Sequence, residues 1–211
     1  MKIKKNNGFT LLEMMITISV LAILVGIAIP SFQKVIQNSR LDNAARNIYS
    51  IFNSARQEAI ASGQKGFVCR SQDNPIDVDN LFCTNQNRSD WNFGLIAYRT
   101  LPGMILLAPN NSYGNQRINS GNFPTTTQEQ RNQMTMRVSD FQDNGVEYVS
   151  NRNESVVVFN ANGALVNTAP FRITICDSRD EAEGKYIEIN AVGRIFLKNI
   201  EGSGLSCNNP A

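Results

Sequence analysis

The chain has 211 residues, enough for one ordinary domain or two small ones, and it contains four cysteines but no histidine. Without histidine it lacks the commonest general base and the commonest zinc ligand, which disfavours most catalytic and metal-centred functions. The formal net charge of +2 is too small to indicate nucleic-acid binding by itself. We therefore expect no enzymatic activity, no cofactor and no metal ion.

The N-terminal segment carries a membrane signal. Residues 1–8 are short and polar with three lysines, and residues 9–29 form an apolar run whose single charged residue is Glu13. About 20 such residues span a bilayer as a helix, and the preceding lysines place the N-terminus in the cytoplasm. A secretory signal peptide is the alternative, but its apolar stretch would be only about 7–15 residues long. We therefore expect a single membrane-spanning helix.

The segment GFTLLEMMITISVLAILVGIAIPSF resembles the processing signal of type IV pilins and of the pseudopilins of type II secretion. The matching positions are Gly8, Phe9, Thr10, Leu11, Glu13 and Pro30. The resemblance implies that a prepilin peptidase cuts between Gly8 and Phe9, that Phe9 becomes N-methylated, and that Glu13 pairs with the terminal amine of a neighbouring subunit. It also implies a single pass through the inner membrane and a periplasmic head, followed by incorporation into a pilus or pseudopilus.

The chemistry of Glu13 agrees with this reading. A carboxylate at the centre of a membrane helix costs about 2.5–3.5 kcal/mol on insertion scales, and less near the interface. An amine freed at Phe9 lies four residues from Glu13, about one helical turn, and is the nearest cation able to compensate a buried carboxylate. A tolerated interfacial charge without a partner is the alternative.

Residues 30–63 are predicted to continue the helix with an amphipathic half. Their apolar residues recur at three- and four-residue steps, which is typical of a helix that covers a sheet. Ser62 and Gly63 form a stop signal, and Gly26 and Pro30 are expected to bend or locally melt the helix. The predicted apolar face consists of Phe32, Val35, Ile36, Leu41, Ala44, Ala45, Ile48, Ile51, Phe52, Ala55, Ala59 and Ile60.

Residues 64–211 are predicted to form a β-rich head. Two asparagine-rich stretches, 71–90 and 110–133, are expected to be loops, and Asn162-Gly163 is a hairpin signal. We predict an α+β fold in which the long N-terminal helix packs on a mainly antiparallel head of two sheets. The predicted strands are Gly66–Arg70, Trp91–Arg99, Met104–Ala108, Met134–Ser139, Ser155–Asn160, Phe171–Asp177, Lys185–Asn190 and Arg194–Lys198.

Four weaker motifs in this order are similar to the GspH/FimT family of minor pilins and pseudopilins: NSARQEAIASGQKGFVC, WNFGLIAY, VVFNANGAL and ITICDS…GKYIEINAVGRI. The resemblance implies a minor pilin that helps to assemble, prime or cap a type IV pilus. A minor pseudopilin of type II secretion is the alternative. The implied partners are other pilins or pseudopilins, prepilin peptidase and the inner membrane.

A third alternative is DNA capture during natural transformation, which is associated with FimT-type members through a C-terminal GRxR motif. The matching place reads Gly193-Arg194-Ile195-Phe196, so the second arginine is missing. Arg194, Phe196 and Lys198 alternate onto one face of the predicted strand. They are candidate DNA contacts, because cations attract phosphates and an aromatic ring stacks on bases. An ordinary solvated edge strand is the competing interpretation.

The four cysteines, Cys69, Cys83, Cys176 and Cys207, have no C-x-x-C spacing, so a zinc or thioredoxin-like site is not expected. An even number of cysteines in an oxidising compartment predicts two disulfides. Three pairings exist, and we expect the sequence-local one, Cys69–Cys83 and Cys176–Cys207. Four buried thiols are the alternative.

Overall fold

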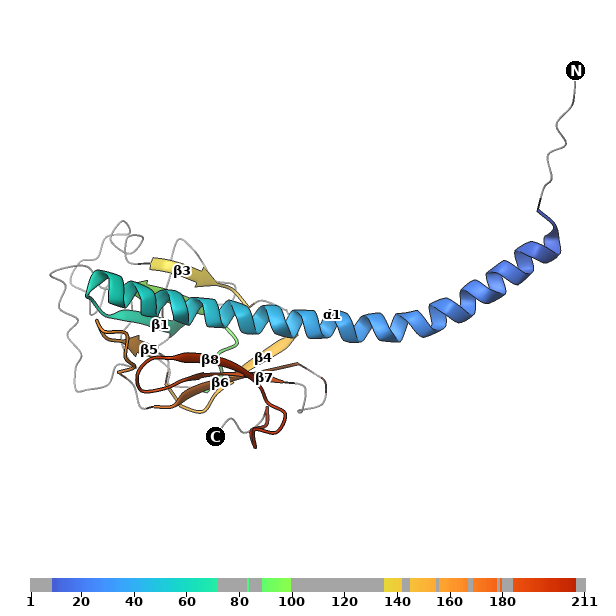
Figure 1. Cartoon of the computed structure of the whole chain (residues 1–211). Coiled ribbons are helices and arrows are strands. Elements are labelled where there is room, and N and C mark those ends of the chain that lie inside the picture. The colour runs from blue at the N-terminus through green and yellow to red at the C-terminus, as the bar shows by residue number, and fades with distance from the viewer. Residues whose placement is uncertain are drawn as a thin grey trace, which may run out of the picture. The chain divides into compact units, whose positions relative to one another are not determined.

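The computed structural model describes residues 9–71, 83, 89–99, 135–141, 145–154, 156–166, 169–177, 179 and 184–207. In these residues one long helix precedes eight strands, which confirms the predicted α+β class (Figure 1). The elements are α1 (Leu11–Ser62), β1 (Gly66–Arg70), β2 (Leu95–Arg99), β3 (Thr135–Ser139), β4 (Val146–Ser150), β5 (Val156–Phe159), β6 (Phe171–Asp177), β7 (Lys185–Ile189) and β8 (Ile195–Asn199).

Helix α1 ends at the predicted signal and is continuous where a bend or a locally melted stretch was expected. It stops at Ser62, and Gly63 follows with a φ of 65°, the left-handed conformation that glycine adopts easily after a helix. The helix passes through Gly26 and Pro30 without a break, so of the two expected alternatives, a bend or a locally melted stretch, the melted stretch is wrong. Proline removes only one N–H from the hydrogen-bond ladder, and the neighbouring bonds are enough to keep the helix intact.

The chain divides into two units, of which the first ends at Ser39 and the second begins at Arg40. Leu41 is the first helix residue that belongs to the buried core. Phe32, Val35 and Ile36 were predicted to belong to the buried face but are exposed. Ile60, near the C-terminal end of the helix, is 46% exposed as well. The amphipathic pattern therefore marks a buried helix face only from Leu41 onward.

The described residues of the head form two antiparallel sheets, as predicted, and each sheet has four strands. Their strand orders are β3-β2-β1-β5 and β4-β6-β7-β8. The C-terminal part of α1 is tied to both sheets: Asn47 hydrogen-bonds Ser139 of β3 in the first sheet, and Asp42 forms a 2.7 Å ion pair with Lys185 of β7 in the second. Arg56 also donates to the carbonyl of Gly163 at 3.1 Å. These contacts fix the helix along the core that the sheets enclose.

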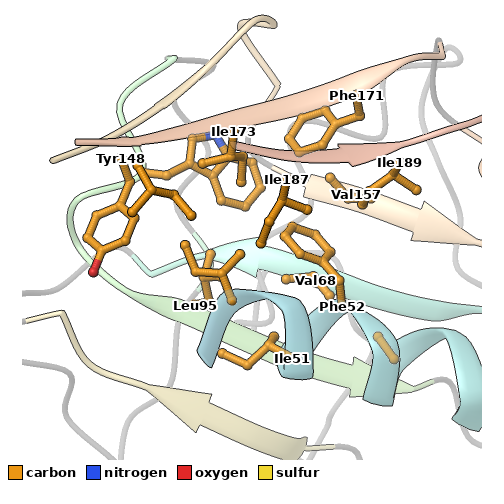
Figure 2. Close-up of a cluster of buried hydrophobic side chains, with 14 of the residues drawn as sticks. Ile51, Phe52, Val68, Leu95, Tyr148, Val157, Phe171, Ile173, Ile187 and Ile189 are labelled. Atoms are coloured by element: carbon orange, nitrogen blue, oxygen red, sulfur yellow. The ribbon is translucent and has the colours of Figure 1, made fainter. Parts of the chain in front are cut away.

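The core is made by one face of α1 and the inner faces of both sheets (Figure 2). Phe52 lies at its centre and approaches Trp91 and Phe171, with ring centroids 6.4 and 6.2 Å apart. The rings of Trp91 and Phe171 meet edge to face at 5.5 Å. Such aromatic pairs add about 0.5–1.5 kcal/mol beyond the burial of their surface. This cluster joins the helix to the segment before β2 and to β6.

The first sheet is buried on its outer face as well. Phe67 and Tyr98 stack there with centroids 4.8 Å apart, and all five residues of β1 are buried. Burial raises the pKa of the Tyr98 hydroxyl above its usual value. Strands buried on both faces appear in sequence as continuous apolar runs, and VVVF of β5 has this form.

Most strand predictions agree with the structure. The bounds of β1 and β6 are those predicted, and β2 starts four residues later than expected because Trp91 donates its backbone N–H to Tyr148 of β4 instead. Strand β4 was missed, although the alternation of buried Val146, exposed Glu147 and buried Tyr148 is a strand signal. After Gly163 only an isolated bridge forms, between Phe159 and Leu165. The predicted strand at 104–108, residues 72–82 and 84–88 of the first loop, and the loop at 110–133 lie outside the described residues.

Candidate functional site

The beginning of α1 is organised by Thr10, whose role the sequence analysis missed. Its side-chain oxygen accepts the backbone N–H of Glu13 at 3.2 Å, and its carbonyl accepts the N–H of Met14. Thr10 therefore caps the helix, and Thr-Leu-Leu-Glu has the spacing of a capping box. The spacing of Thr10 and Glu13 in the sequence was the signal that could have predicted this cap. Glu13 also lies where the helix dipole favours a negative charge.

The side chains of the apolar part of α1 are exposed in the described part of the chain. Phe9, the residue after the predicted cleavage point, is 79% exposed, and Glu13 is exposed one turn along. The helix contains an 18-residue window with a mean hydropathy of 2.5, and none of it is buried inside the structure. By length and composition this helix is able to cross a membrane. Gly8 lies outside the described residues, and the roles of Phe9 and Glu13 stay predictions.

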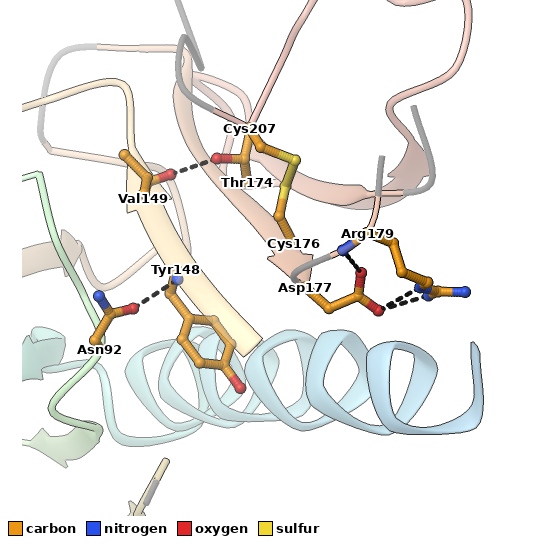
Figure 3. Close-up of a disulfide and its surroundings, with 8 residues drawn as sticks. All are labelled: Asn92, Tyr148, Val149, Thr174, Cys176, Asp177, Arg179 and Cys207. Atoms are coloured by element: carbon orange, nitrogen blue, oxygen red, sulfur yellow. Dashed lines mark hydrogen bonds and ion pairs between the residues drawn. A yellow bond between two sulfur atoms is a disulfide. The ribbon is translucent and has the colours of Figure 1, made fainter. Parts of the chain in front are cut away.

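The four cysteines form two disulfides in the expected pairing. Cys69 is bonded to Cys83 with Cα atoms 5.6 Å apart, and Cys176 to Cys207 with Cα atoms 5.9 Å apart. The second bond is shown in Figure 3, where it joins β6 to the segment that follows β8. No cysteine is free. The four are therefore structural and carry no thiol chemistry.

The bond between Cys176 and Cys207 is surrounded by a small apolar cluster. Tyr186 and Ile200 are buried with Cys176, and Leu205 packs against them. Gly184 completes this packing, because a Cβ atom there would lie 2.5 Å from Cδ1 of Ile200 and 2.8 Å from Sγ of Cys176. The C-terminal segment is thereby held against the outer face of the second sheet.

The structure places the candidate DNA contacts on the outward face of the second sheet, with Arg194 directly before β8 and Phe196 and Lys198 on β8. Phe196 is 37% exposed. The Lys198 ammonium lies over the rings of Tyr186 and Phe196, at 5.7 and 5.2 Å from their centroids, and forms a 3.2 Å ion pair with Glu188. The lysine is therefore already compensated, which reduces its availability to a phosphate. DNA contact by these residues stays a prediction.

Glu188 is the residue of this surface that the sequence analysis missed. Its carboxylate accepts a 2.7 Å hydrogen bond from Nε of Arg172, besides the contact with Lys198. Arg172, Glu188 and Lys198 lie on the three neighbouring strands β6, β7 and β8. Strand register is needed to bring them together, so the linear sequence alone did not reveal this cluster.

The cluster predicts a pH dependence of stability. The hydrogen bond from Arg172 lowers the pKa of Glu188, burial opposes this, and Lys198 lowers it further. Because the pKa is lower in the folded state, the ionised carboxylate stabilises the fold above the unfolded pKa of about 4.3. This stabilisation is lost as the pH falls through the folded pKa. We expect Glu188→Gln to be less stable than wild type between about pH 5 and 7, with the difference shrinking below about pH 4.

Urea unfolding at a series of pH values measures this difference. Glu147→Gln is the matched control, because Glu147 is exposed on β4 and its loss should change stability little at any pH. A difference between wild type and Glu188→Gln that is as large at about pH 2.5 as at neutral pH would contradict the prediction.

The profile described as Type II transport protein GspH matches residues 44–193, and the profile of the prokaryotic N-terminal methylation motif matches residues 3–29. No curated relative matches the chain at the sequence level. The two profile matches together extend from the predicted leader to the turn before β8.

Three solved structures are similar. Two crystal forms of the type IV minor pilin FimU of Pseudomonas aeruginosa have TM-scores of 0.50 and 0.49 at 20% and 19% identity. The matches cover 82% and 81% of this chain and 96% and 100% of those chains. The minor pseudopilin EpsH of Vibrio cholerae has a TM-score of 0.42 at 16% identity, covering 76% of this chain and 97% of that chain. At these identities the likeness to FimU shows a common fold.

Proposed function

Because the chain belongs to the GspH family and carries the N-terminal methylation motif, we propose that it is a minor pilin that helps to assemble, prime or cap a type IV pilus. The observation that carries the proposal is the N-terminal helix. Its apolar residues are exposed along the whole membrane-length window, and one carboxylate, Glu13, lies near its start. Such a surface is stable only when lipid or other apolar helices cover it.

The proposed mechanism has three steps. Prepilin peptidase removes residues 1–8, and the amine of Phe9 becomes the methylated terminus. The helix then leaves the lipid and packs among the N-terminal helices of neighbouring subunits. In that apolar surrounding, Glu13 requires a cation, and the terminal amine of a neighbour supplies one. The pair compensates both charges and sets the axial position of the incoming subunit.

The head has no catalytic part in this mechanism. Its four cysteines are paired, and the described residues contain no group of three His, Cys, Asp or Glu side chains able to hold a metal ion. The fold shared with FimU, a type IV minor pilin, supports a role in a pilus, whereas the matching family profile is described as a type II transport protein. A minor pseudopilin of a type II secretion system is therefore the counterpart that the experiment must separate from a pilin.

Glu13→Gln is expected to leave membrane insertion and leader cleavage close to wild type and to remove most of the subunit from filaments. Leaving one member of a buried charge pair without its partner costs about 3–5 kcal/mol, which corresponds to a loss of at least about 100-fold in incorporation. The measurement is the amount of the chain in sheared filaments relative to whole cells, with Glu147→Gln as the control. Wild-type amounts of Glu13→Gln in filaments would contradict the mechanism.

The same strains separate the two systems. If surface pili are lost while type II secretion continues, the chain acts in the pilus. If secretion is lost while pili remain, the chain is a pseudopilin and the pilus assignment is wrong.

A further inference from the structure

We propose that the outer edge of β8 binds an extended, acidic segment of another polypeptide by strand addition. β8 is the last strand of the second sheet, and all five of its residues pair in regular register with β7. An exposed sheet edge offers a row of backbone donors and acceptors that an extended peptide can satisfy. This concerns a partner of the head and goes beyond filament assembly by α1.

Two of the other edge strands are covered by the chain itself. The segment before β2 covers β4: Trp91 donates to the carbonyl of Tyr148 at 2.8 Å, and Ser150 donates to the carbonyl of Ser89 at 2.6 Å. The segment after the Gly163 turn covers β5, where Val166 donates to the carbonyl of Val158 at 2.8 Å. The backbone hydrogen-bonding groups at the edges of β4 and β5 are therefore satisfied by other segments of the chain. In the described residues, no segment does the same for β8.

The hydrogen-bonding groups that remain free on β8 can be identified from its register. Asn190 donates to the carbonyl of Arg194, and Ile200 donates to the carbonyl of Gly184, so the even-numbered residues of β8 bond toward β7. Bonded and non-bonded positions alternate along an antiparallel pair. The backbone N–H and C=O groups of Ile195, Leu197 and Asn199 therefore point outward. In the described part of the chain nothing bonds to them.

The devices that usually protect such an edge do not protect this one. β8 contains no proline, and its pairing with β7 has no bulge. Lysines on an edge normally discourage pairing, but the ammonium of Lys198 is drawn back over β7 by Glu188 and Tyr186. Lys185, on β7, is bonded to Asp42. Within the residues that the structure describes, the outward backbone of β8 is left open.

The side chains around the edge define the chemistry of the occupant. Ile195 and Leu197 are half-buried against the core, so a strand added beside them gains by presenting apolar residues at the facing positions. Arg194 has no carboxylate partner among the described residues, whereas the ammonium of Lys198 on the same face is already paired with Glu188. Arg194 is therefore the cation that favours an acidic residue in the occupant. An occupant with apolar residues on one face and acidic residues on the other fits both surfaces.

The probe is an acetylated and amidated peptide of sequence TTEVTVE, labelled with fluorescein. Paired antiparallel to β8, its two valines lie opposite Leu197 and Ile195, and its two glutamates lie opposite Lys198 and Arg194. Fluorescence anisotropy with the full chain in detergent micelles measures binding. We expect saturable binding that weakens at least about tenfold when the first valine is N-methylated, because one edge hydrogen bond is then lost.

Matched variants of the chain locate the site. Asn199→Pro removes an outward N–H and keeps the backbone bonds to β7, since proline is tolerated where its missing N–H faces solvent. It also loses the 3.1 Å hydrogen bond that Nζ of Lys185 donates to Oδ1 of Asn199, and the control Asn199→Ser loses the same bond. We expect Asn199→Pro to weaken the peptide at least about tenfold, whereas Asn199→Ser, which keeps the N–H, binds as wild type. Amide hydrogen exchange should slow at Leu197 and Asn199 on peptide addition and stay unchanged at Phe196, which is already bonded to β7.

Each other outcome overturns the proposal. Equal binding of the N-methylated peptide, or of Asn199→Pro, shows that the peptide does not add to β8. If no binding is detected up to about 1 mM peptide, the proposed site is wrong. If the chain self-associates and Asn199→Pro abolishes this association, the occupant of the edge is a second copy of the chain. Binding of a double-stranded DNA oligonucleotide that falls steeply with salt and displaces the peptide assigns the surface to nucleic acid instead.

Discussion

Phe52→Ala is expected to lower the free energy of unfolding of the head by about 3–5 kcal/mol. The Phe52 side chain is fully buried and contacts the rings of Trp91 and Phe171. Its removal leaves a cavity at the point where α1, the segment before β2 and β6 meet. Because Trp91 is the single tryptophan of the chain, its fluorescence during urea unfolding reports directly on this cluster.

The matched control is Phe32→Ala, the same substitution on the same helix. Phe32 is 66% exposed, so its truncation should change the free energy of unfolding by less than about 0.5 kcal/mol. We expect the opposite order in filaments, where Phe32 is available for contact with neighbouring subunits and Phe52 is not. Equal destabilisation by the two variants would contradict the assignment of Leu41 as the start of the buried helix face.

The sequence predicted the long helix and the strands because both depend on local patterns. The helix has a continuous apolar run and a Ser62-Gly63 stop, and each of these signals is local in the sequence. β1 and β6 are bounded by clear changes of composition, and their predicted bounds agree with the structure. Such local signals predict a helix or a strand without information about the residues that pack against it.

The buried extent of α1 was predicted less well, because burial depends on what covers a face. Phe32 and Ile36 repeat with the same spacing as Ile48 and Phe52, yet only the latter are buried by the sheets. An apolar stripe indicates that a partner is needed and does not tell whether it is the same chain or another subunit. In this helix both kinds of partner are expected, on successive stretches of one stripe.

The surface formed by Arg194, Phe196 and Lys198 shows a second limit of prediction from sequence. Alternation placed Arg194, Phe196 and Lys198 on one face, but it gave no sign that Glu188 neutralises Lys198. That contact depends on the register between β7 and β8, where Tyr186 is paired with Lys198 and Glu188 with Phe196. A prediction of a binding surface from one strand alone therefore overestimates the number of unpaired charges on it. Neighbouring strands contribute residues that are distant in sequence and neutralise some of these charges.

Replacing Cys176 and Cys207 together by alanine is expected to lower the free energy of unfolding by about 4 kcal/mol, from the loop-entropy estimate for a sequence separation of 31. The corresponding loss for Cys69 and Cys83, with a separation of 14, is about 3 kcal/mol. Paired substitutions are used so that no free thiol remains. Urea unfolding followed by Trp91 fluorescence measures both, and wild type with reductant should reproduce the sum of the two losses.

The two bonds should also differ in where the structure loosens, and this separates a local clamp from a general effect on the unfolded chain. Cys176 and Cys207 hold residues 200–207 against Tyr186, so their loss should speed amide exchange in that segment before global unfolding. Cys69 lies inside the outer cluster of the first sheet with Phe67 and Tyr98, so its loss should act there. If each paired variant accelerates exchange uniformly through both sheets, the bonds stabilise only by restricting the unfolded state. A local response confined to residues 200–207 would instead show that the C-terminal segment depends on its disulfide for its position against the outer face of the second sheet.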